Sequence, residues 1–161
     1  MKDSKTLNLT QSAIIAALYV VLTIAISAVN LASGVIQFRI SEALTILPFF
    51  TAAAIPGLAV GCFLSNLITG CAMLDVVFGT LATLIGALGT RALRKNRWLA
   101  PLPPILANAF IVPFVLRYAY GVPDAIWFMV ITVGIGEIIS CGVLGEMLLS
   151  ALQPMKDRLF K

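Results

Sequence analysis

The chain has 161 residues, of which 60% are hydrophobic and only 11% are charged, and its mean hydropathy is +1.03. A soluble fold of this size could not bury so much apolar surface, so the composition excludes a water-soluble globular protein and predicts a single membrane domain, residues 1–161. The net charge of +4 lies in short basic clusters between apolar runs, which favours a membrane surface over nucleic acid as their partner.

Six apolar runs follow one another along the chain. A membrane-spanning helix needs about 20 mostly apolar residues, which leaves room for six spans joined by short loops. The runs cover about residues 9–31, 43–55, 57–70, 74–93, 105–118 and 124–152. Pro48 lies inside the second run, where we expect a kink, and Gly57 and Gly61 lie one turn apart in the third, where another helix can approach closely. We therefore predict an all-α membrane protein with six transmembrane helices.

The basic residues predict the orientation of these helices. If the N-terminus is cytoplasmic, six crossings place 9 of the 11 lysines and arginines on the cytoplasmic side and leave Arg39 and Arg117 outside. The nine are Lys2, Lys5, Arg91, Arg94, Lys95, Arg97, Lys156, Arg158 and Lys161. Cytoplasmic loops of membrane proteins carry an excess of Lys and Arg, so we expect both the N-terminus and the C-terminus in the cytoplasm.

Two glutamates within the apolar runs are candidate functional residues. A charged side chain costs at least about 2.5 kcal/mol at the centre of a membrane helix, so each one needs a reason. Glu137 lies halfway along the last run among glycines, where it either contacts a ligand or forms a hydrogen bond between helices as a neutral acid. Glu42 follows Arg39 by three residues, a spacing that allows a structural ion pair, and both flank an outer loop that could close over a solute.

Four other polar residues have both a structural and a functional interpretation. Asp75 and Asp124 open outer helix ends, where a carboxylate can cap free N–H groups; we favour capping for Asp124 and leave both interpretations open for Asp75. Asn66 and Asn108 are amides at membrane depth, suited to hydrogen bonds between helices and equally to the polar edge of a heterocycle.

Aromatic residues gather near the expected outer face. Tyr118, Tyr120 and Trp127 fit the aromatic belt that membrane proteins place at the interface with water. Alternatively, Tyr118 or Trp127 could stack on a planar ligand.

Several common catalytic and cofactor motifs are missing from the sequence. It contains no histidine and no GxxxxGK[ST] phosphate-binding loop, so it cannot hydrolyse ATP as a complete pump or hold a histidine-ligated metal. Cys62, Cys71 and Cys141 lie in apolar stretches without CxxC spacing. We expect no catalytic residues, no metal and no cofactor.

Five segments of the chain carry a specific pattern: QFRISEALTILPFF at 37–50, AIPGL at 54–58, DVVFGTLATLIG at 75–86, APLPPILANA at 100–109 and VGIGE at 133–137. These segments resemble the QueT family, the substrate-binding S components of energy-coupling factor (ECF) transporters. The likeness extends over nearly the whole chain, and it implies an S-component-like bundle of six helices in the cell membrane of a prokaryote.

The resemblance also implies a substrate, partners and a site. The substrate would be a queuosine precursor, such as the cationic base 7-aminomethyl-7-deazaguanine, bound by a nucleobase-sized site among polar residues. A guanine-like edge suits a carboxylate such as Glu137 or Glu42, and the ligand's ammonium group would favour Asp75. The candidate ligand-binding residues are Phe38, Arg39, Glu42, Asn66, Asp75, Asn108, Tyr118, Trp127 and Glu137.

The implied partners are a transmembrane coupling subunit and its two ATPase subunits, which supply energy while the loaded S component reorients in the lipid. Small residues of the first helix would dock on the coupling subunit, and Ala13 and Ala17 match that pattern, although ordinary helix packing explains such pairs equally well. The alternatives are an S component for another vitamin or nucleobase and, from different classes, an intramembrane enzyme or a structural helix bundle.

Overall fold

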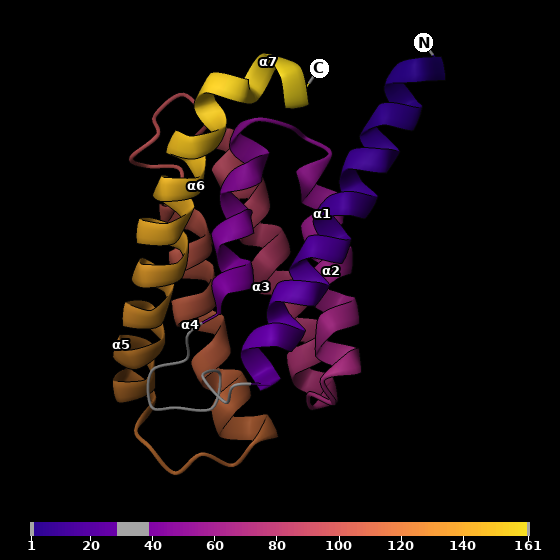
Figure 1. Ribbon diagram of the computed structural model, residues 1–161. Coiled ribbons are helices and arrows are strands. Elements are labelled where there is room, and N and C mark those ends of the chain that lie inside the picture. Colours follow the sequence, from indigo (N-terminus) through magenta and orange to yellow (C-terminus); the bar gives the residue numbers. More distant parts are fainter. Residues whose placement is uncertain (1, 29–38, 161) are drawn as a thin grey trace.

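The computed structural model describes residues 2–28 and 39–160, and these residues form helices joined by turns, with no β-strand among them (Figure 1). The elements are α1 (Lys2–Ala28), η1 (Ile40–Phe49), α2 (Ala54–Ile68), α3 (Met73–Ala92), α4 (Leu102–Ala119), α5 (Ile126–Glu137), η2 (Ile138–Leu144), α6 (Gly145–Leu152), η3 (Gln153–Met155) and α7 (Lys156–Leu159). The outer loop that we expected to close over a solute, including Phe38, lies outside the described residues.

Each of the six predicted apolar runs contains helix, but the helices differ in length. Four stretches are long and apolar enough to cross a membrane: Lys5–Ala28, Met73–Ala92, Leu102–Ala119 and Ile126–Leu159. The runs between the first and second of these form two shorter apolar helices, Ile40–Phe49 and Ala54–Ile68. The all-helical fold with several candidate membrane spans is therefore confirmed, whereas the count of six crossings stays a prediction.

The helix η1 lies at the centre of the bundle. It contacts α1, α2, α3, α6 and η2, and every residue from Ser41 to Pro48 is buried (Figure 1, purple ribbon). We expected an α-helix kinked at Pro48, but the whole element is a 3₁₀ helix. A proline removes one backbone donor and its ring disfavours α-helical geometry in the preceding turn, and the tighter helix accommodates both effects. This central element carries Glu42 into the interior.

The helices α1 and α2 pack as closely as the glycine pair in α2 predicted. A Cβ atom on Gly57 would lie 2.7 Å from the backbone oxygen of Ser12, and one on Gly61 would lie 2.8 Å from Cβ of Tyr19. Because only glycine fits at this distance, the pair brings α1 against α2 and fixes where the Tyr19 side chain enters the core.

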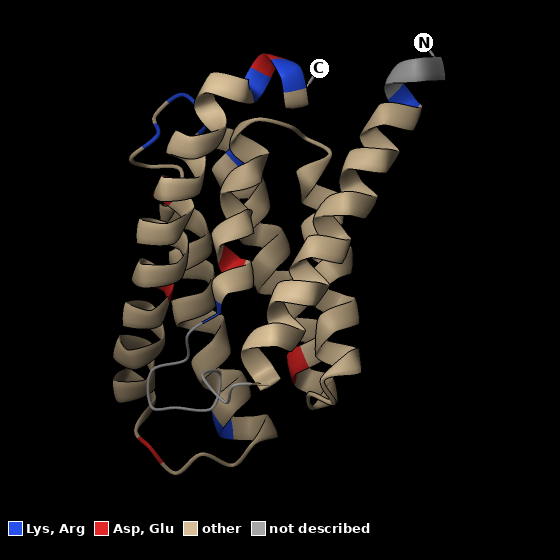
Figure 2. Ribbon diagram, in the orientation of Figure 1, with Lys and Arg blue, Asp and Glu red and all other residues tan. Residues whose placement is uncertain are grey.

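Both termini lie at the same end of the bundle, since successive elements run in alternating directions (Figure 1). Lysines and arginines gather at this end as well, in α7, in the turn after α3 and at the start of α1 (Figure 2). The charge asymmetry that the sequence predicted is therefore present in three dimensions.

Candidate ligand-binding site

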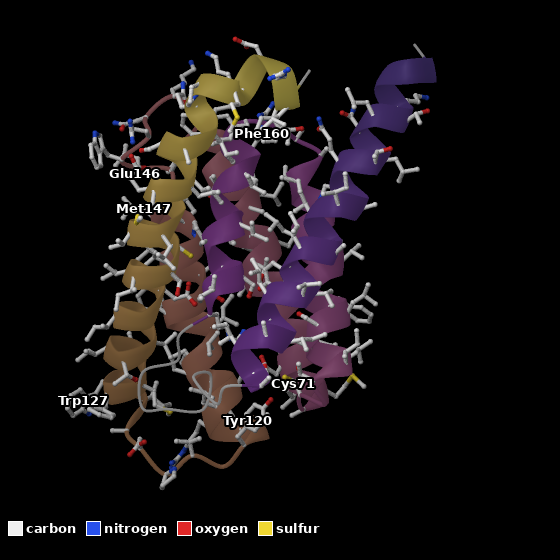
Figure 3. All side chains as sticks on the ribbon, in the orientation of Figure 1. Cys71, Tyr120, Trp127, Glu146, Met147 and Phe160 are labelled. Carbon is white, nitrogen blue, oxygen red and sulfur yellow. The ribbon has the colours of Figure 1, made fainter. Side chains whose placement is uncertain are left out.

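A cavity of about 320 Å³ opens between α1, α2, α3 and α4. It lies toward the end of the bundle opposite the termini, where Figure 3 shows Cys71 and Tyr120 side by side. The volume is at the lower end of the range of small-molecule sites. Its polar lining includes Arg39, Ser41, Asn66, Thr69, Asp75 and Tyr120.

Asp75 is the central carboxylate of this cavity. Its Oδ2 atom accepts a hydrogen bond of 2.9 Å from the Tyr120 hydroxyl and lies 3.9 Å from Nη2 of Arg39. Its Oδ1 atom is buried and has no hydrogen-bond partner among the described residues. Asp75 lies in the first turn of α3, but Ala72 is the N-cap and no side chain caps the helix. Asp75 lines the cavity and its side chain makes no capping hydrogen bond, so the capping interpretation is wrong, although its place in the first turn suits the helix dipole.

Tyr120 follows the last residue of α4 and reaches across to the start of α3. Its hydroxyl oxygen accepts a hydrogen bond of 3.1 Å from the backbone N–H of Ala72 while its proton is donated to Asp75. Burial, together with the nearby Asp75 charge, raises the pKa of the Tyr120 hydroxyl. The phenol therefore stays protonated and remains a hydrogen-bond donor to the carboxylate.

Asn66 and Gly79 complete the wall beside Asp75. The Asn66 amide donates to the backbone oxygen of Asp75 at 3.4 Å and is 3% exposed. Gly79 lies one helical turn after Asp75, and a Cβ atom there would be 2.9 Å from Asp75 Oδ1 and 3.2 Å from Asn66 Nδ2. The absence of a side chain at Gly79 therefore provides the space that both polar groups occupy.

A second polar cluster is buried deeper in the bundle, around η1 and the last membrane helix. One side-chain ligand atom from each of Glu42, Glu137 and Cys141 lies within 4.8 Å of the others, and all three residues are buried. Tyr19 donates a hydrogen bond to Glu42 Oε1, and Cys141 donates one of 3.1 Å to Glu137 Oε2. Asn108 is close enough to interact with both carboxylates.

Two features of the deep cluster indicate a binding role. Glu42 Oε2 has no hydrogen-bond partner among the described residues although the side chain is only 1% exposed. Residues 138–144 form a π-helix immediately after Glu137 and carry Cys141, and such widened turns occur frequently at functional sites. If both carboxylates were ionised, their repulsion at this distance would be about 3 kcal/mol at an effective dielectric constant of about 20.

Arg39 lies between the cavity and the deep cluster. Its guanidinium interacts with the charges of both Asp75 and Glu42. The expected ion pair between Arg39 and Glu42 at helical spacing is wrong, because the Arg39 backbone is extended and its side chain is within 4 Å of Asp75. Glu42 turns toward Tyr19 instead.

The predicted polar residues therefore divide into two groups. Asn66, Asp75 and Arg39 line the cavity, while Glu42, Asn108 and Glu137 lie beneath it.

Other predicted residues lie elsewhere. Tyr118 is 73% exposed beside Phe110 and Phe114, and Trp127 is 68% exposed with its ring against Phe128, so both lie on the apolar outer surface. Their assignment to a ligand stays a prediction without a contact that supports it. The aromatic residue at the cavity is Tyr120, the C-cap residue of α4, which as a residue two positions after Tyr118 points to a different side of the helix.

Two further expectations concern a helix end and the surface of α1. Asp124 is exposed and does not cap α5, because Ala125 occupies the N-cap and no side chain bonds there, so this expectation is wrong. Ala13 and Ala17 are exposed on the face of α1 that points away from α2, beside apolar side chains such as Leu18 and Val21.

These features define a class of protein: a membrane-embedded helical bundle that encloses a polar cavity of small-molecule size toward one end. The chain belongs to the QueT transporter family, because residues 9–154 match the model of that family. The resemblance seen in the sequence is thereby confirmed.

A named relative supports the same family. The chain is 41% identical over 85 residues to the queuosine precursor transporter QueT of Lactococcus lactis subsp. cremoris. The matching stretch covers 53% of this chain and 50% of that protein, so the comparison spans about half the length of the relative. No solved structure matches the chain.

Proposed function

We propose that this chain is the substrate-binding S component of an ECF-type importer and that it binds a queuosine precursor, 7-aminomethyl-7-deazaguanine or a close relative, from outside the cell. The observation that carries the proposal is the polar cavity, in which the buried Asp75 offers an oxygen without a partner. Membership of the QueT transporter family and the name of the Lactococcus relative supply the substrate class.

The proposed ligand matches the polar groups of both the cavity and the deep cluster. Its ammonium group pairs with Asp75, while the N–H donors of its guanine-like edge pair with the carboxylates of Glu42 and Glu137. Asn66 and Asn108 are amides that suit its carbonyl group. Because the two acids lie beneath Arg39, ligand entry requires the Arg39 side chain to move aside. The distance between Asp75 and the deep acids would then be spanned by the ligand itself.

The proposed topology has six crossings in the cell membrane of a prokaryote with both termini cytoplasmic. The basic end of the bundle carries both termini, which supports a cytoplasmic assignment for that end (Figure 2). At about 2.0 Å per residue the ten residues of η1 extend only about 20 Å, so this crossing requires its flanking residues as well. The cavity then faces the outside, where the solute is captured.

The proposed coupling to energy uses the exposed face of α1. Ala13 and Ala17 present small, exposed side chains there, which suits close docking onto a transmembrane coupling subunit. Two ATPase subunits bound to that coupling subunit would supply the energy, and the loaded S component would deliver its ligand by reorienting as a body. The chain itself acts as a transport subunit and not as an enzyme.

Direct binding tests the proposal. The purified protein in detergent is titrated with radiolabelled 7-aminomethyl-7-deazaguanine, and we expect saturable binding at one site per chain. The same protein is titrated with riboflavin as a chemically different planar vitamin, which we expect not to bind. Saturable binding of riboflavin with none of the deazaguanine would assign the protein to another vitamin and overturn the substrate. An absence of binding to any planar heterocycle would overturn the transport assignment.

A further inference from the structure

The two oxygens of the Asp75 carboxylate have different surroundings. Oδ2 accepts the Tyr120 hydroxyl at 2.9 Å and has the Arg39 guanidinium at 3.9 Å. Oδ1 is buried without a partner, although Asp75 lines the cavity and is only 4% exposed. One oxygen is therefore held by protein groups, while the other has no hydrogen-bond partner among the described residues.

The backbone N–H of Ala72 fixes the direction of the Tyr120 hydroxyl. This N–H donates to the phenol oxygen at 3.1 Å, so the phenol proton points to Asp75 Oδ2. A hydrogen bond with one defined donor and one defined acceptor restrains the rotation of the carboxylate. Tyr120 is thus attached to the start of α3 at two points.

The opposite side of the carboxylate rests over Gly79. Residues four apart share one face of a helix, so a side chain at position 79 would project directly beside Asp75. The Cβ of an alanine would be 2.9 Å from Oδ1, closer than a non-bonded contact allows. The obstructing atom is the end of a flexible side chain, so the helix would persist and the carboxylate would rotate away.

We propose that Tyr120 and Gly79 are positioning residues that hold the Asp75 carboxylate in the cavity wall with Oδ1 free of protein hydrogen bonds, and that this carboxylate selects ligands with a cationic amine over neutral analogues. The inference rests on the proposed function and adds that the site recognises the cationic amine of the ligand. A buried carboxylate oxygen gains a strong charge-assisted hydrogen bond from an ammonium group, whereas a neutral group without a donor leaves it unsatisfied. The Arg39 guanidinium lies 3.9 Å from Oδ2 and makes no hydrogen bond to Oδ1, so it does not replace the hydrogen bond from the ligand.

Two ligands of nearly equal shape test this inference. The amine probe is 7-aminomethyl-7-deazaguanine and the neutral probe is 7-cyano-7-deazaguanine, and the measured quantity is the ratio of their dissociation constants. We expect the unaltered protein to bind the amine at least about tenfold more tightly, as the charge-assisted hydrogen bond implies. Asp75→Asn should bring the ratio close to one.

The positioning residues are tested by the same ratio. Gly79→Ala and Tyr120→Phe should each lower the ratio severalfold by weakening amine binding, with little change in the affinity for the nitrile. Gly134→Ala is the matched control, because its Cβ would meet only Cβ of Ala109 at 3.8 Å, and it should leave the ratio unchanged. Tyr120→Phe removes one oxygen without adding volume, so it remains informative if Gly79→Ala folds poorly.

The possible results separate this inference from the proposed function. Equal affinity of the unaltered protein for both probes would overturn the selection of cations and leave the transport assignment standing. A uniform loss of affinity for both probes in Gly79→Ala and Tyr120→Phe would show a general structural role and overturn the positioning. If the unaltered protein bound neither probe, the proposed function would fail and this inference with it.

Discussion

Replacing Glu137 by glutamine should weaken ligand binding without destabilising the protein. The side chain is 4% exposed at the end of α5, and its Oε2 accepts the Cys141 thiol at 3.1 Å. Glutamine has nearly the same volume and can still accept that hydrogen bond through its carbonyl oxygen, so packing is preserved. The change removes a carboxylate from a cluster that also contains Glu42.

The structure gives the magnitude of both effects. A hydrogen bond from the ligand to a charged acceptor contributes about 1 to 3 kcal/mol, so the dissociation constant should rise about 5- to 150-fold. The free energy of unfolding should increase or remain the same. Carboxylate oxygens of Glu42 and Glu137 lie within 4.8 Å of each other, and two ionised carboxylates at that distance repel by about 3 kcal/mol, so removing one charge relieves a repulsion of that order.

The assay combines equilibrium binding of the radiolabelled amine with thermal unfolding of the same preparation in detergent. Glu146→Gln is the matched control, because Glu146 is ion-paired with Arg97 at the basic end of the bundle, away from the cavity (Figure 3). It should lower the unfolding temperature slightly and leave binding unchanged. If the Glu137→Gln protein bound the ligand with unchanged affinity and unfolded at a lower temperature, the ligand contact would be refuted. Glu137 would then serve to form a hydrogen bond between helices.

Three further predictions concern packing, access and coupling. Gly61→Ala should destabilise the protein by about 1 to 3 kcal/mol, since its Cβ would lie 2.8 Å from that of the facing tyrosine, whereas Gly134→Ala should be tolerated in the same thermal-unfolding assay. Cys71 lines the cavity and is the one cysteine of the three that is not buried. A maleimide should therefore label Cys71 first, and bound ligand should slow this labelling. Equal labelling rates with and without ligand would contradict the cavity as the binding site. Ala13→Trp and Ala17→Trp should abolish uptake by cells while leaving binding to the purified protein intact, and unimpaired uptake would remove α1 from the docking surface.

Hydrophobic runs and charges were sufficient to predict the helices. Lipid requires every backbone polar group to be bonded within the segment, so a long apolar run has essentially one choice of structure, and the sequence identified all six runs. The glycine spacing in α2 also predicted a close helix contact, because a missing side chain acts locally at the helix surface, and the structure shows that α1 makes it. The form of η1 was not predictable in this way, since a buried 3₁₀ helix depends on the elements packed around it.

Polar residues could be selected as candidates from the sequence because ions are costly in lipid, and that rule singled out Glu42 and Glu137 without knowledge of the fold. Asp75 was a candidate because it opens a helix at the expected outer face. Their partners could not be inferred, because each partner comes from a distant part of the chain. Tyr120 reaches Asp75 across 45 residues, and Tyr19 reaches Glu42 across 23. The side chain of Arg39 lies beside Asp75 and not beside Glu42. The reason is that the Arg39 backbone is extended, so Arg39 and Glu42 do not share one helix face.

The amino-acid sequence by itself determined that this protein is helical with membrane-like apolar segments, which end is basic, and that Glu42, Asn66, Asn108 and Glu137 lie at depth, because burial in lipid is decided by each segment's own composition. Only the tertiary structure decided which of those residues share a cavity, because a side chain's neighbours depend on how the helices pack. The unpartnered oxygen of Asp75 exists only through that packing: Tyr120 from the end of α4 occupies one side of the carboxylate, and the bare surface of Gly79 leaves room for the other.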